Sequence, residues 1–283
     1  MGGRIGRLRS TWTIVNGQPI HARVSAEPVP AEAPAVVLVH GMSVSSRYLV
    51  PTAERLAPFY RVFAPDLPGF GLSVKPRRTL DVPELADALA AWMNAAGLGR
   101  AALLGNSFGC QIIANFAARY PERVERAVLQ GPTVPADERT VPRQLLRWLQ
   151  NSPLEPPSLS LVVARDYLDC GPRRLVETFR YALRDRIEAK LPCIHAPVLV
   201  VRGSRDVMCP QDWAEMVIRL VPDGRLRVIP GGSHTLVYAA PLELVRVVRP
   251  FLDEARGPRG EPQPLGGGRA HESAIHPQLH REL

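Results

Sequence analysis

The chain has 283 residues, of which 46% are hydrophobic and 22% are charged, and its formal net charge is +8. This composition is ordinary for a globular protein and suits one large core with an inserted subdomain. The basic residues are nearly all arginines spread along the chain, without a stripe of interleaved aromatic residues. The composition therefore argues against a nucleic-acid-binding protein.

Targeting and metal-binding signals are weak. No apolar run has the length of a membrane span, and residues 1–10 lack the apolar segment of a signal peptide. We therefore expect a cytoplasmic protein without a membrane partner. The four cysteines show no metal-ligand spacing, so we expect no metal and no cofactor. Three tail histidines could form a weak metal-binding tract, although a solvated tail is the simpler interpretation: His271, His276 and His280.

Predicted strands and helices alternate along most of the chain. An Asn-Gly turn at Asn16 and Gly17 predicts a hairpin over Thr13–Val24. Further strands are predicted at Ala35–Val39, Tyr60–Ala64, Arg100–Leu104, Arg126–Gln130, Pro197–Arg202 and Arg225–Ile229, and helices at Pro51–Ala57, Val82–Ala96, Phe108–Tyr120, Gln211–Val221 and Leu242–Ala255. This alternation predicts an α/β fold with a doubly wound, mostly parallel sheet of eight strands that starts with an antiparallel pair.

Residues 132–192 interrupt the alternation with proline-rich linkers. Helical patterns within them cover Arg143–Leu149, Leu159–Leu168 and Pro172–Ala189. We expect a helical cap over the carboxyl ends of the strands, where open α/β sheets bind ligands, with Trp148 and Tyr167 as candidate pocket residues. The predicted organisation is a core of residues 1–131 and 193–256, a cap of residues 132–192 and a disordered tail of residues 257–283.

A nucleophilic serine is predicted at the centre of Gly105-Asn106-Ser107-Phe108-Gly109. This G-x-S-x-G pattern follows an apolar strand and precedes a helix, as a nucleophile elbow requires. The two glycines allow the strand and the helix to pass close together, so Ser107 projects at the tip of the turn. Ser107 is therefore the candidate nucleophile.

Partners for Ser107 follow later strands. The strand Pro197–Arg202 leads into Asp206, and the strand Arg225–Ile229 leads into His234. A serine hydroxyl needs a base to remove its proton, and the order Ser, Asp, His is the one described for α/β-hydrolases. We predict that His234 is the base and that Asp206 orients it, in preference to Asp212 and Asp166.

The loop after Ala35–Val39 supplies a candidate oxyanion hole. It begins with His40-Gly41-Met42, and the backbone N–H of Met42 can turn toward the serine, with the N–H of Phe108 as the second donor. His40 and Phe70 are further candidate pocket residues.

Taken together, these motifs resemble those of the α/β-hydrolase family, in its capped serine-hydrolase branch. The resemblance covers Thr13–Ala255 and rests on His40-Gly41, Asp66-Leu67-Pro68-Gly69-Phe70-Gly71-Leu72-Ser73, Gly105-Asn106-Ser107-Phe108-Gly109, Gly203-Ser204-Arg205-Asp206 and Gly232-Ser233-His234. It implies a serine hydrolase acting on a carboxylic ester or lactone of a small organic molecule.

Departures from the family's other patterns narrow this expectation. Members that open epoxides or remove halides have an aspartate where this chain has Ser107, which argues against both activities. The meta-cleavage C–C hydrolases share Gly105-Asn106-Ser107, but they usually carry Gly-Pro-Gly after the His-Gly pair and a Trp where Thr235 stands here. C–C hydrolysis, acyl transfer to an alcohol, amine or peroxide, and a ligand receptor without catalysis are the alternatives. The oligomeric state is left open, with a homodimer as one option.

Overall fold

A computed structural model describes residues 4–26 and 33–254 of the chain. The predicted tail, residues 257–283, and its histidines lie outside the described residues. Within the described ranges, none of the helices combines the length and the hydropathy needed to cross a membrane.

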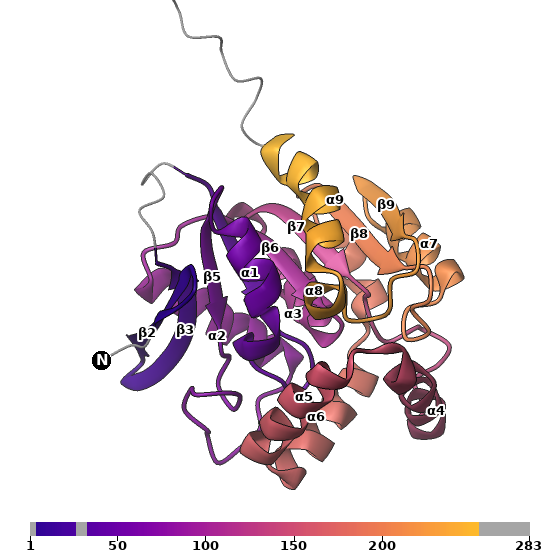
Figure 1. Cartoon of the computed structure of the whole chain (residues 1–283), viewed down its shortest axis with the longest axis horizontal. Helices are drawn as coiled ribbons and strands as arrows, with labels where there is room; N and C mark the ends of the chain where they lie inside the picture. Colours follow the sequence, from indigo (N-terminus) through magenta and orange to yellow (C-terminus); the bar gives the residue numbers. More distant parts are fainter. Residues whose placement is uncertain (1–3, 27–32, 255–283) are drawn as a thin grey trace, which may run out of the picture.

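A single sheet forms the centre of the molecule (Figure 1). Its strand order is β1-β2-β3-β5-β4-β6-β7-β8-β9; pairings from β1 through β3 to β5 are antiparallel and all the others are parallel. The strands are β1 (Arg4–Ile5), β2 (Leu8–Val15), β3 (Gln18–Ser25), β4 (Ala35–Val39), β5 (Arg61–Pro65), β6 (Ala101–Asn106), β7 (Val124–Gln130), β8 (Val198–Gly203) and β9 (Gly224–Ile229). Eight of these correspond to the predicted mostly parallel sheet, and the two-residue β1 adds a ninth strand at its edge.

The predicted Asn-Gly hairpin joins β2 to β3. Asn16 and Gly17 have φ angles of 50° and 76°, as the twist of a two-residue hairpin turn requires. The predicted antiparallel start of the sheet is confirmed, and β4 and β6 are neighbours within the parallel part that follows it.

Helices cover both faces of the sheet. They are α1 (Val50–Leu56), α2 (Val82–Ala95), α3 (Phe108–Arg119), α4 (Val141–Asn151), α5 (Pro157–Cys170), α6 (Pro172–Arg184), α7 (Gln211–Leu220), α8 (Leu236–Ala239) and α9 (Pro241–Asp253), with short 3-10 turns η1 (Ser46–Leu49), η2 (Pro121–Arg123), η3 (Ser152–Leu154), η4 (Ile187–Ala189) and η5 (Leu191–Cys193). Helices α2, α3 and α7 contribute to the core on one face, and α1, α8 and α9 contribute to the core on the other. Figure 1 shows α1 and α9 in front of the sheet.

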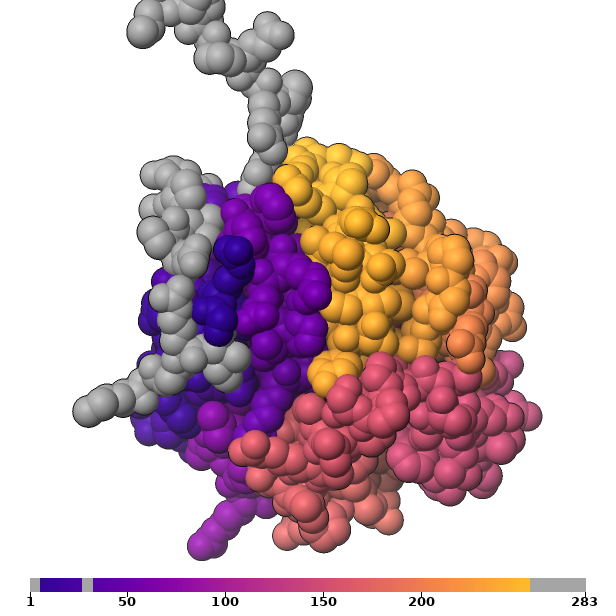
Figure 2. Space-filling model, in the orientation of Figure 1, coloured from indigo at the N-terminus to yellow at the C-terminus, as the bar shows by residue number. Residues whose placement is uncertain are grey.

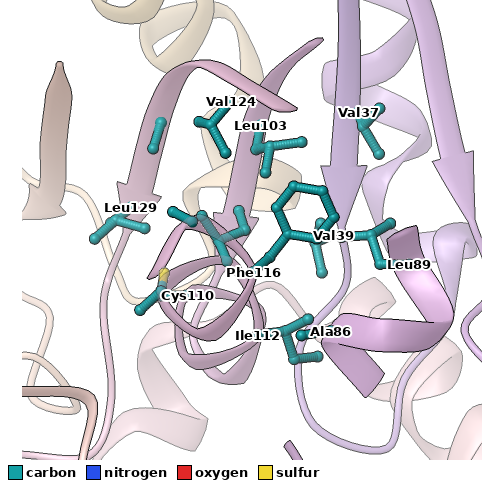
Figure 3. Close-up of a cluster of buried hydrophobic side chains, with 14 of the residues drawn as sticks. Val37, Val39, Ala86, Leu89, Leu103, Cys110, Ile112, Phe116, Val124 and Leu129 are labelled. Atoms are coloured by element: carbon teal, nitrogen blue, oxygen red, sulfur yellow. The ribbon is translucent and has the colours of Figure 1, made fainter. Parts of the chain in front are cut away.

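Alternate strand residues feed the two cores. Val37 and Val39 of β4 pack on the face that α2 and α3 cover, whereas Val36 and Leu38 pack on the opposite face. Successive side chains of a strand point to opposite faces, which explains why the central strands are apolar throughout. In Figure 3 the side chains of Val37, Val39, Leu103, Val124 and Leu129 face those of Ala86, Leu89, Cys110, Ile112 and Phe116.

The region between β7 and β8 contains α4, η3, α5 and α6, followed by η4 and η5. We call residues 132–192 the helical insertion. Its helices form one end of the molecule, below the sheet in the view of Figure 1 and pink to salmon in Figure 2. The predicted third helical pattern, Pro172–Ala189, is divided by the structure, because α6 ends at Arg184 and a separate turn begins at Ile187.

Candidate active site

Ser107 stands between the end of β6 and the start of α3. Its φ and ψ of 57° and −120° are a strained conformation for a residue with a side chain. A Cβ on Gly105 would lie 2.7 Å from the carbonyl carbon of Gly109, and a Cβ on Gly109 would collide with the carbonyl oxygen of Val39. Both glycines are therefore required by the close approach of strand and helix, which forces the sharp turn at Ser107.

His234 and Asp206 are in direct contact. The Nδ1 atom of His234 lies 3.0 Å from each carboxylate oxygen of Asp206, which is 2% exposed. The Oδ1 atom of Asp206 also accepts hydrogen bonds from the backbone N–H groups of Met208 and Cys209, both at 2.9 Å. These bonds fix the carboxylate, and the carboxylate in turn fixes the plane of the imidazole.

The two other aspartates considered from the sequence lie elsewhere. Asp212 accepts a hydrogen bond from the backbone N–H of Trp213 at the start of α7. Asp166 accepts hydrogen bonds from the backbone N–H and the hydroxyl of Ser45, both at 2.8 Å. Of the three aspartates, Asp206 is the one that contacts His234.

The environment of His234 shifts its pKa in opposing directions. Burial lowers the pKa of the imidazole, but the carboxylate of Asp206, by its charge and its hydrogen bond, and the charge of Glu155 raise it. The net shift is upward from the ordinary histidine value. An imidazole of this kind accepts a proton more readily than one in water.

Ser107 and His234 line the same cavity. The Oγ atom of Ser107 lies 3.4 Å from the Oγ1 atom of Thr133, and among the described residues no hydrogen bond joins Ser107 to His234. Long contacts between a nucleophile and its base are common when no substrate is bound. The structure thus brings Ser107 and His234 to one cavity and links His234 directly to Asp206 behind it.

Gly131 is a part of this site that the sequence analysis missed. It follows β7 with a φ of +57°, and a Cβ there would lie 2.9 Å from Nδ1 of His234 and 3.0 Å from Oδ2 of Asp206. A side chain would therefore push into the contact between His234 and Asp206. The sequence pattern indicates only that Gly131 follows the end of a strand.

A buried hydrogen-bond chain connects the three loops of the site. The Tyr48 hydroxyl accepts from the N–H of Gly41 at 2.7 Å and donates to Oδ1 of Asn106 at 3.0 Å. The Nδ2 group of Asn106 donates to Oε1 of Gln130 at 2.7 Å. The Nε2 group of Gln130 then donates to the carbonyl oxygen of His234 at 2.8 Å. This series of hydrogen bonds fixes the loop after β4, the serine turn and the histidine loop relative to one another.

The predicted oxyanion donors occupy different surroundings. Met42 lines the cavity, whereas the side chain of Phe108 is 1% exposed and packs in the core. Within residues 33–254, neither the N–H of Met42 nor that of Phe108 donates a hydrogen bond, and the two residues flank Gly41 and Ser107 respectively. Both N–H groups are therefore without a hydrogen-bond acceptor among the described residues.

Two predicted pocket residues lie outside the cavity. His40 is fully buried: its Nε2 accepts a hydrogen bond from the N–H of Leu67 at 3.1 Å, which leaves Nδ1–H to donate to the carbonyl of Gly41 at 2.9 Å. Burial lowers the pKa of His40. Phe70 packs edge-on against the His40 ring, with the centroids 5.2 Å apart. The prediction that His40 and Phe70 line the pocket is corrected here, because neither residue lines the cavity and their rings pack against each other.

The cavity has a volume of about 470 Å³ and is lined mainly by apolar groups, with Trp148 and Tyr167 among them. It lies between the sheet and the helical insertion. Its lining consists of Gly41, Met42, Val44, Tyr48, Asn106, Ser107, Trp148, Asn151, Ser152, Glu155, Leu159, Ser160, Val163, Ala164, Tyr167, Met208, His234 and Thr235. In the part of the chain that the structure describes, no group of three His, Cys, Asp or Glu side chains could hold a metal ion.

Glu155 is a second residue that the sequence analysis missed. It follows η3 in the helical insertion, and its Oε1 accepts from the N–H of Thr235 at 2.9 Å, while its Oε2 accepts from the hydroxyl of Ser233 at 3.0 Å. Glu155 thus contacts both neighbours of His234. Nothing in its local sequence distinguishes it from a surface glutamate.

Known proteins share this architecture. A family model described as the alpha/beta hydrolase fold matches residues 34–159. The chain is 28% identical over 244 residues to the carboxylesterase YbfK of Bacillus subtilis, covering 79% of this chain and 81% of that protein. It is 34% identical over 112 residues to an abhydrolase domain-containing protein of Caenorhabditis elegans, covering 38% of this chain but only 25% of the length of that relative.

A solved structure agrees with these sequence matches. The crystal structure of a membrane phospholipase A superposes with a TM-score of 0.76 at 25% identity, covering 89% of this chain and 88% of that one. The family model and the superposition both support the overall fold described above. The chain therefore has the alpha/beta hydrolase fold.

Proposed function

We propose that the protein is a serine hydrolase that cleaves a carboxylic ester or lactone of a small organic substrate through an acyl-enzyme on Ser107. One observation carries the proposal. A serine in strained backbone lines an apolar cavity together with His234, whose Nδ1 contacts a buried carboxylate. A ligand receptor would have no need for this combination of nucleophile, base and orienting acid.

The proposed reaction has two halves. His234 removes the proton of Ser107, and the serine oxygen attacks the substrate carbonyl. The N–H groups of Met42 and Phe108 stabilise the oxyanion, each worth about 2.7–4 kcal/mol in enzymes of this kind. His234 then protonates the leaving alkoxide. Water activated by the same imidazole hydrolyses the acyl-enzyme, and Asp206 stabilises the imidazolium in both halves.

The shape of the cavity supports a small, largely apolar substrate. A cavity of about 470 Å³ is within the ordinary range for small-molecule sites. We propose that the helical insertion acts as a cap, since α4 and α5 supply the side of the lining that faces away from the sheet. Trp148 and Tyr167 would then contact the acyl or alcohol part of the substrate.

A substrate screen tests this function. The wild-type chain is expected to hydrolyse p-nitrophenyl esters or lactones with a burst of the first product, and a fluorophosphonate is expected to label it. Ser107→Ala should abolish labelling and lower turnover by about 10⁶-fold. Full esterase activity in Ser107→Ala would overturn the assignment.

The same screen separates the alternatives from the proposal. Turnover confined to meta-cleavage dienones would indicate a C–C hydrolase. New products on addition of an alcohol, an amine or peroxide would indicate acyl transfer. A compound that raises the melting temperature without being turned over, with no fluorophosphonate labelling, would indicate a ligand receptor.

A further inference from the structure

Helix α4 of the helical insertion turns its apolar face to the surface. Its buried residues are the polar Gln144 and Asn151. Its large apolar residues are each between 46% and 56% exposed: Val141, Leu145, Leu146, Trp148 and Leu149. An amphipathic helix in a globular protein ordinarily does the reverse. The apolar face of α4 is therefore available to something outside the described chain.

The orientation of α4 is fixed by polar contacts on its inner face. The Arg147 guanidinium pairs with the carboxylate of Glu138 and also donates to the carbonyl oxygen of Val207. Gln144 donates to the carbonyl of Glu138 at 3.1 Å, and Asn151 donates to Glu155 at 3.1 Å. Turning the apolar face inward would break these bonds, so the outward face belongs to the folded arrangement.

Helix α5 adds a second exposed apolar strip. Leu161 and Leu168 are 75% and 84% exposed, and they lie seven positions apart on one side of the helix. The neighbouring side of α5 lines the cavity through Leu159, Val163 and Tyr167. The exposed strip therefore continues directly into the lining.

The mouth of the cavity lies between these two helices. Among the lining residues, the exposed ones all come from α4, α5 and the residues between them: Trp148, Ser152, Ser160 and Ala164. We call Leu145, Leu146, Trp148 and Leu149 of α4 with Leu161 and Leu168 of α5 the apolar rim. Figure 1 shows α4 at the lower right of the molecule, to the side of α5 and α6.

The charges around the apolar rim favour an anionic surface. Helix α4 contains no acidic residue, and both acidic residues of α5, Asp166 and Asp169, are paired with Arg47. Arg143 and Arg165 are exposed and, within residues 4–26 and 33–254, have no carboxylate partner. The Arg143 guanidinium donates a hydrogen bond to the carbonyl oxygen of Asp137 at 3.0 Å. Two positive charges without an ion-pair partner among the described residues thus stand beside the apolar rim.

We propose that the apolar rim docks onto the surface of an anionic lipid layer and holds the cavity mouth against it. A helix with Leu and Trp on one face and Arg on the other lies in the plane of such a surface, with its apolar face at the boundary between headgroups and acyl chains. If the proposed function holds, this docking lets an ester dissolved in the lipid enter the cavity without crossing water. This part of the proposal rests on the proposed function. The docking itself departs from the expectation of no membrane partner.

A second copy of the chain fits the apolar rim less well. A copy packed against both helices would cover Trp148, Ser152, Ser160 and Ala164, which are the exposed lining residues through which a substrate must pass. A lipid surface covers the same side chains while itself supplying the substrate. The geometry therefore favours a lipid surface as the occupant.

Vesicle binding tests the docking independently of turnover. The Ser107→Ala variant is used so that the vesicle lipids are not hydrolysed. It is mixed with vesicles of phosphatidylcholine containing phosphatidylglycerol and, separately, with pure phosphatidylcholine vesicles. We expect the protein to sediment with the first and more weakly with the second. In the same background, Leu145→Glu with Leu149→Glu should lower the bound fraction about tenfold or more. Leu242→Glu, at a leucine 44% exposed on α9, is the matched control and should bind normally.

Tryptophan fluorescence identifies the face that touches the lipid. Of the four tryptophans, Trp148 and Trp12 are 46% and 52% exposed, whereas Trp92 and Trp213 are buried. The blue shift on adding vesicles should be lost in Trp148→Phe and kept in Trp12→Phe. Melting temperatures verify that each variant is folded.

Three results would overturn the proposal. They are absence of vesicle binding, normal binding by the double variant, or a dimer in solution that the double variant dissociates. Turnover of soluble p-nitrophenyl acetate by the wild-type chain tests the proposed function separately. Vesicle binding without any turnover would leave the docking standing and remove the hydrolase assignment.

Discussion

The carboxylate of Glu155 accepts a hydrogen bond from the N–H of Thr235 at 2.9 Å, so the helical insertion holds the loop that carries His234. Glu155→Ala removes this bond and should lower kcat about tenfold or more, because one charge-assisted hydrogen bond is lost. Glu155→Gln keeps an acceptor but removes the charge that helps to raise the pKa of His234.

The two variants are separated by their pH profiles. Glu155→Gln should move the acidic limb of kcat/KM to lower pH with a smaller loss of kcat. Glu177→Gln on α6, whose carboxylate contacts Thr79 and Arg173, is the control and should leave the profile unchanged. A purely structural role for Glu155 would change stability without moving the acidic limb.

The pH dependence of activity should report the contact between His234 and Asp206. The net pKa of His234 is raised, and only the neutral imidazole accepts the serine proton. Activity is therefore expected to be lost as the pH falls through a pKa above the ordinary histidine value of about 6.5. Asp206→Asn should lower kcat by about 10⁴-fold. It should also move the acidic limb to lower pH, because the negative charge that raises the pKa of His234 is removed. Asp212→Asn should alter neither quantity.

Relief of backbone strain at Ser107 should be measurable as stability. Glycine adopts the φ of 57° without steric cost, whereas alanine does not. Both Ser107→Gly and Ser107→Ala should be inactive, but the free energy of unfolding should be higher for the glycine variant by about 1 kcal/mol. Chemical denaturation of the two variants measures the difference, and equal stabilities would argue against strain at this turn.

Removal of the Tyr48 hydroxyl should disturb the loop after β4. In Tyr48→Phe the N–H of Gly41 and Oδ1 of Asn106 lose their buried partner, which should cost about 1–3 kcal/mol in the free energy of unfolding. The N–H of Met42 is adjacent to Gly41, so kcat should fall more than KM changes. Unaltered kinetics in a folded Tyr48→Phe protein would show that Met42 is positioned independently of this bond.

An alanine at Gly131 should damage the site more than an alanine at a comparable glycine. Both Gly131 and Gly97 have positive φ angles, of 57° and 71°. A Cβ at Gly97 meets nothing within 4 Å, whereas one at Gly131 would lie 2.9 Å from Nδ1 of His234. Both substitutions should cost backbone energy of about 1 kcal/mol, but only Gly131→Ala should also lose most of the proposed esterase activity.

The elements that the sequence predicts well are those with strong local signals. The Asn16-Gly17 turn, the apolar strand Ala35–Val39 and the glycines on either side of Ser107 each have one physical explanation, and each is present in the structure. Residues that contribute through distant hydrogen bonds were not predicted. Tyr48, Gln130 and Glu155 have no distinguishing neighbours in sequence, because their partners come from other loops.

In the helical insertion, the sequence predicts a helix but does not predict which face of that helix is exposed. The spacing of apolar residues predicts a helix over Arg143–Leu149, and an amphipathic helix is expected to bury its apolar face. The contacts of Arg147 and Gln144 with Glu138, together with those of Arg147 with Val207 and of Asn151 with Glu155, hold that face outward. His40 and Phe70 illustrate the converse, since residues near the site in sequence are used for packing against each other.

By itself, the sequence determined the fold class, the serine turn and the order of the three predicted catalytic residues, because each depends on short-range backbone geometry and strand periodicity. The sequence also favoured Asp206 over the two other aspartates, and the structure shows its contact with His234. The tertiary structure alone decided which side chains line the cavity and which face of α4 is exposed. These outcomes depend on contacts between segments far apart in the chain, where burial and hydrogen-bond partners are set by packing rather than by local pattern.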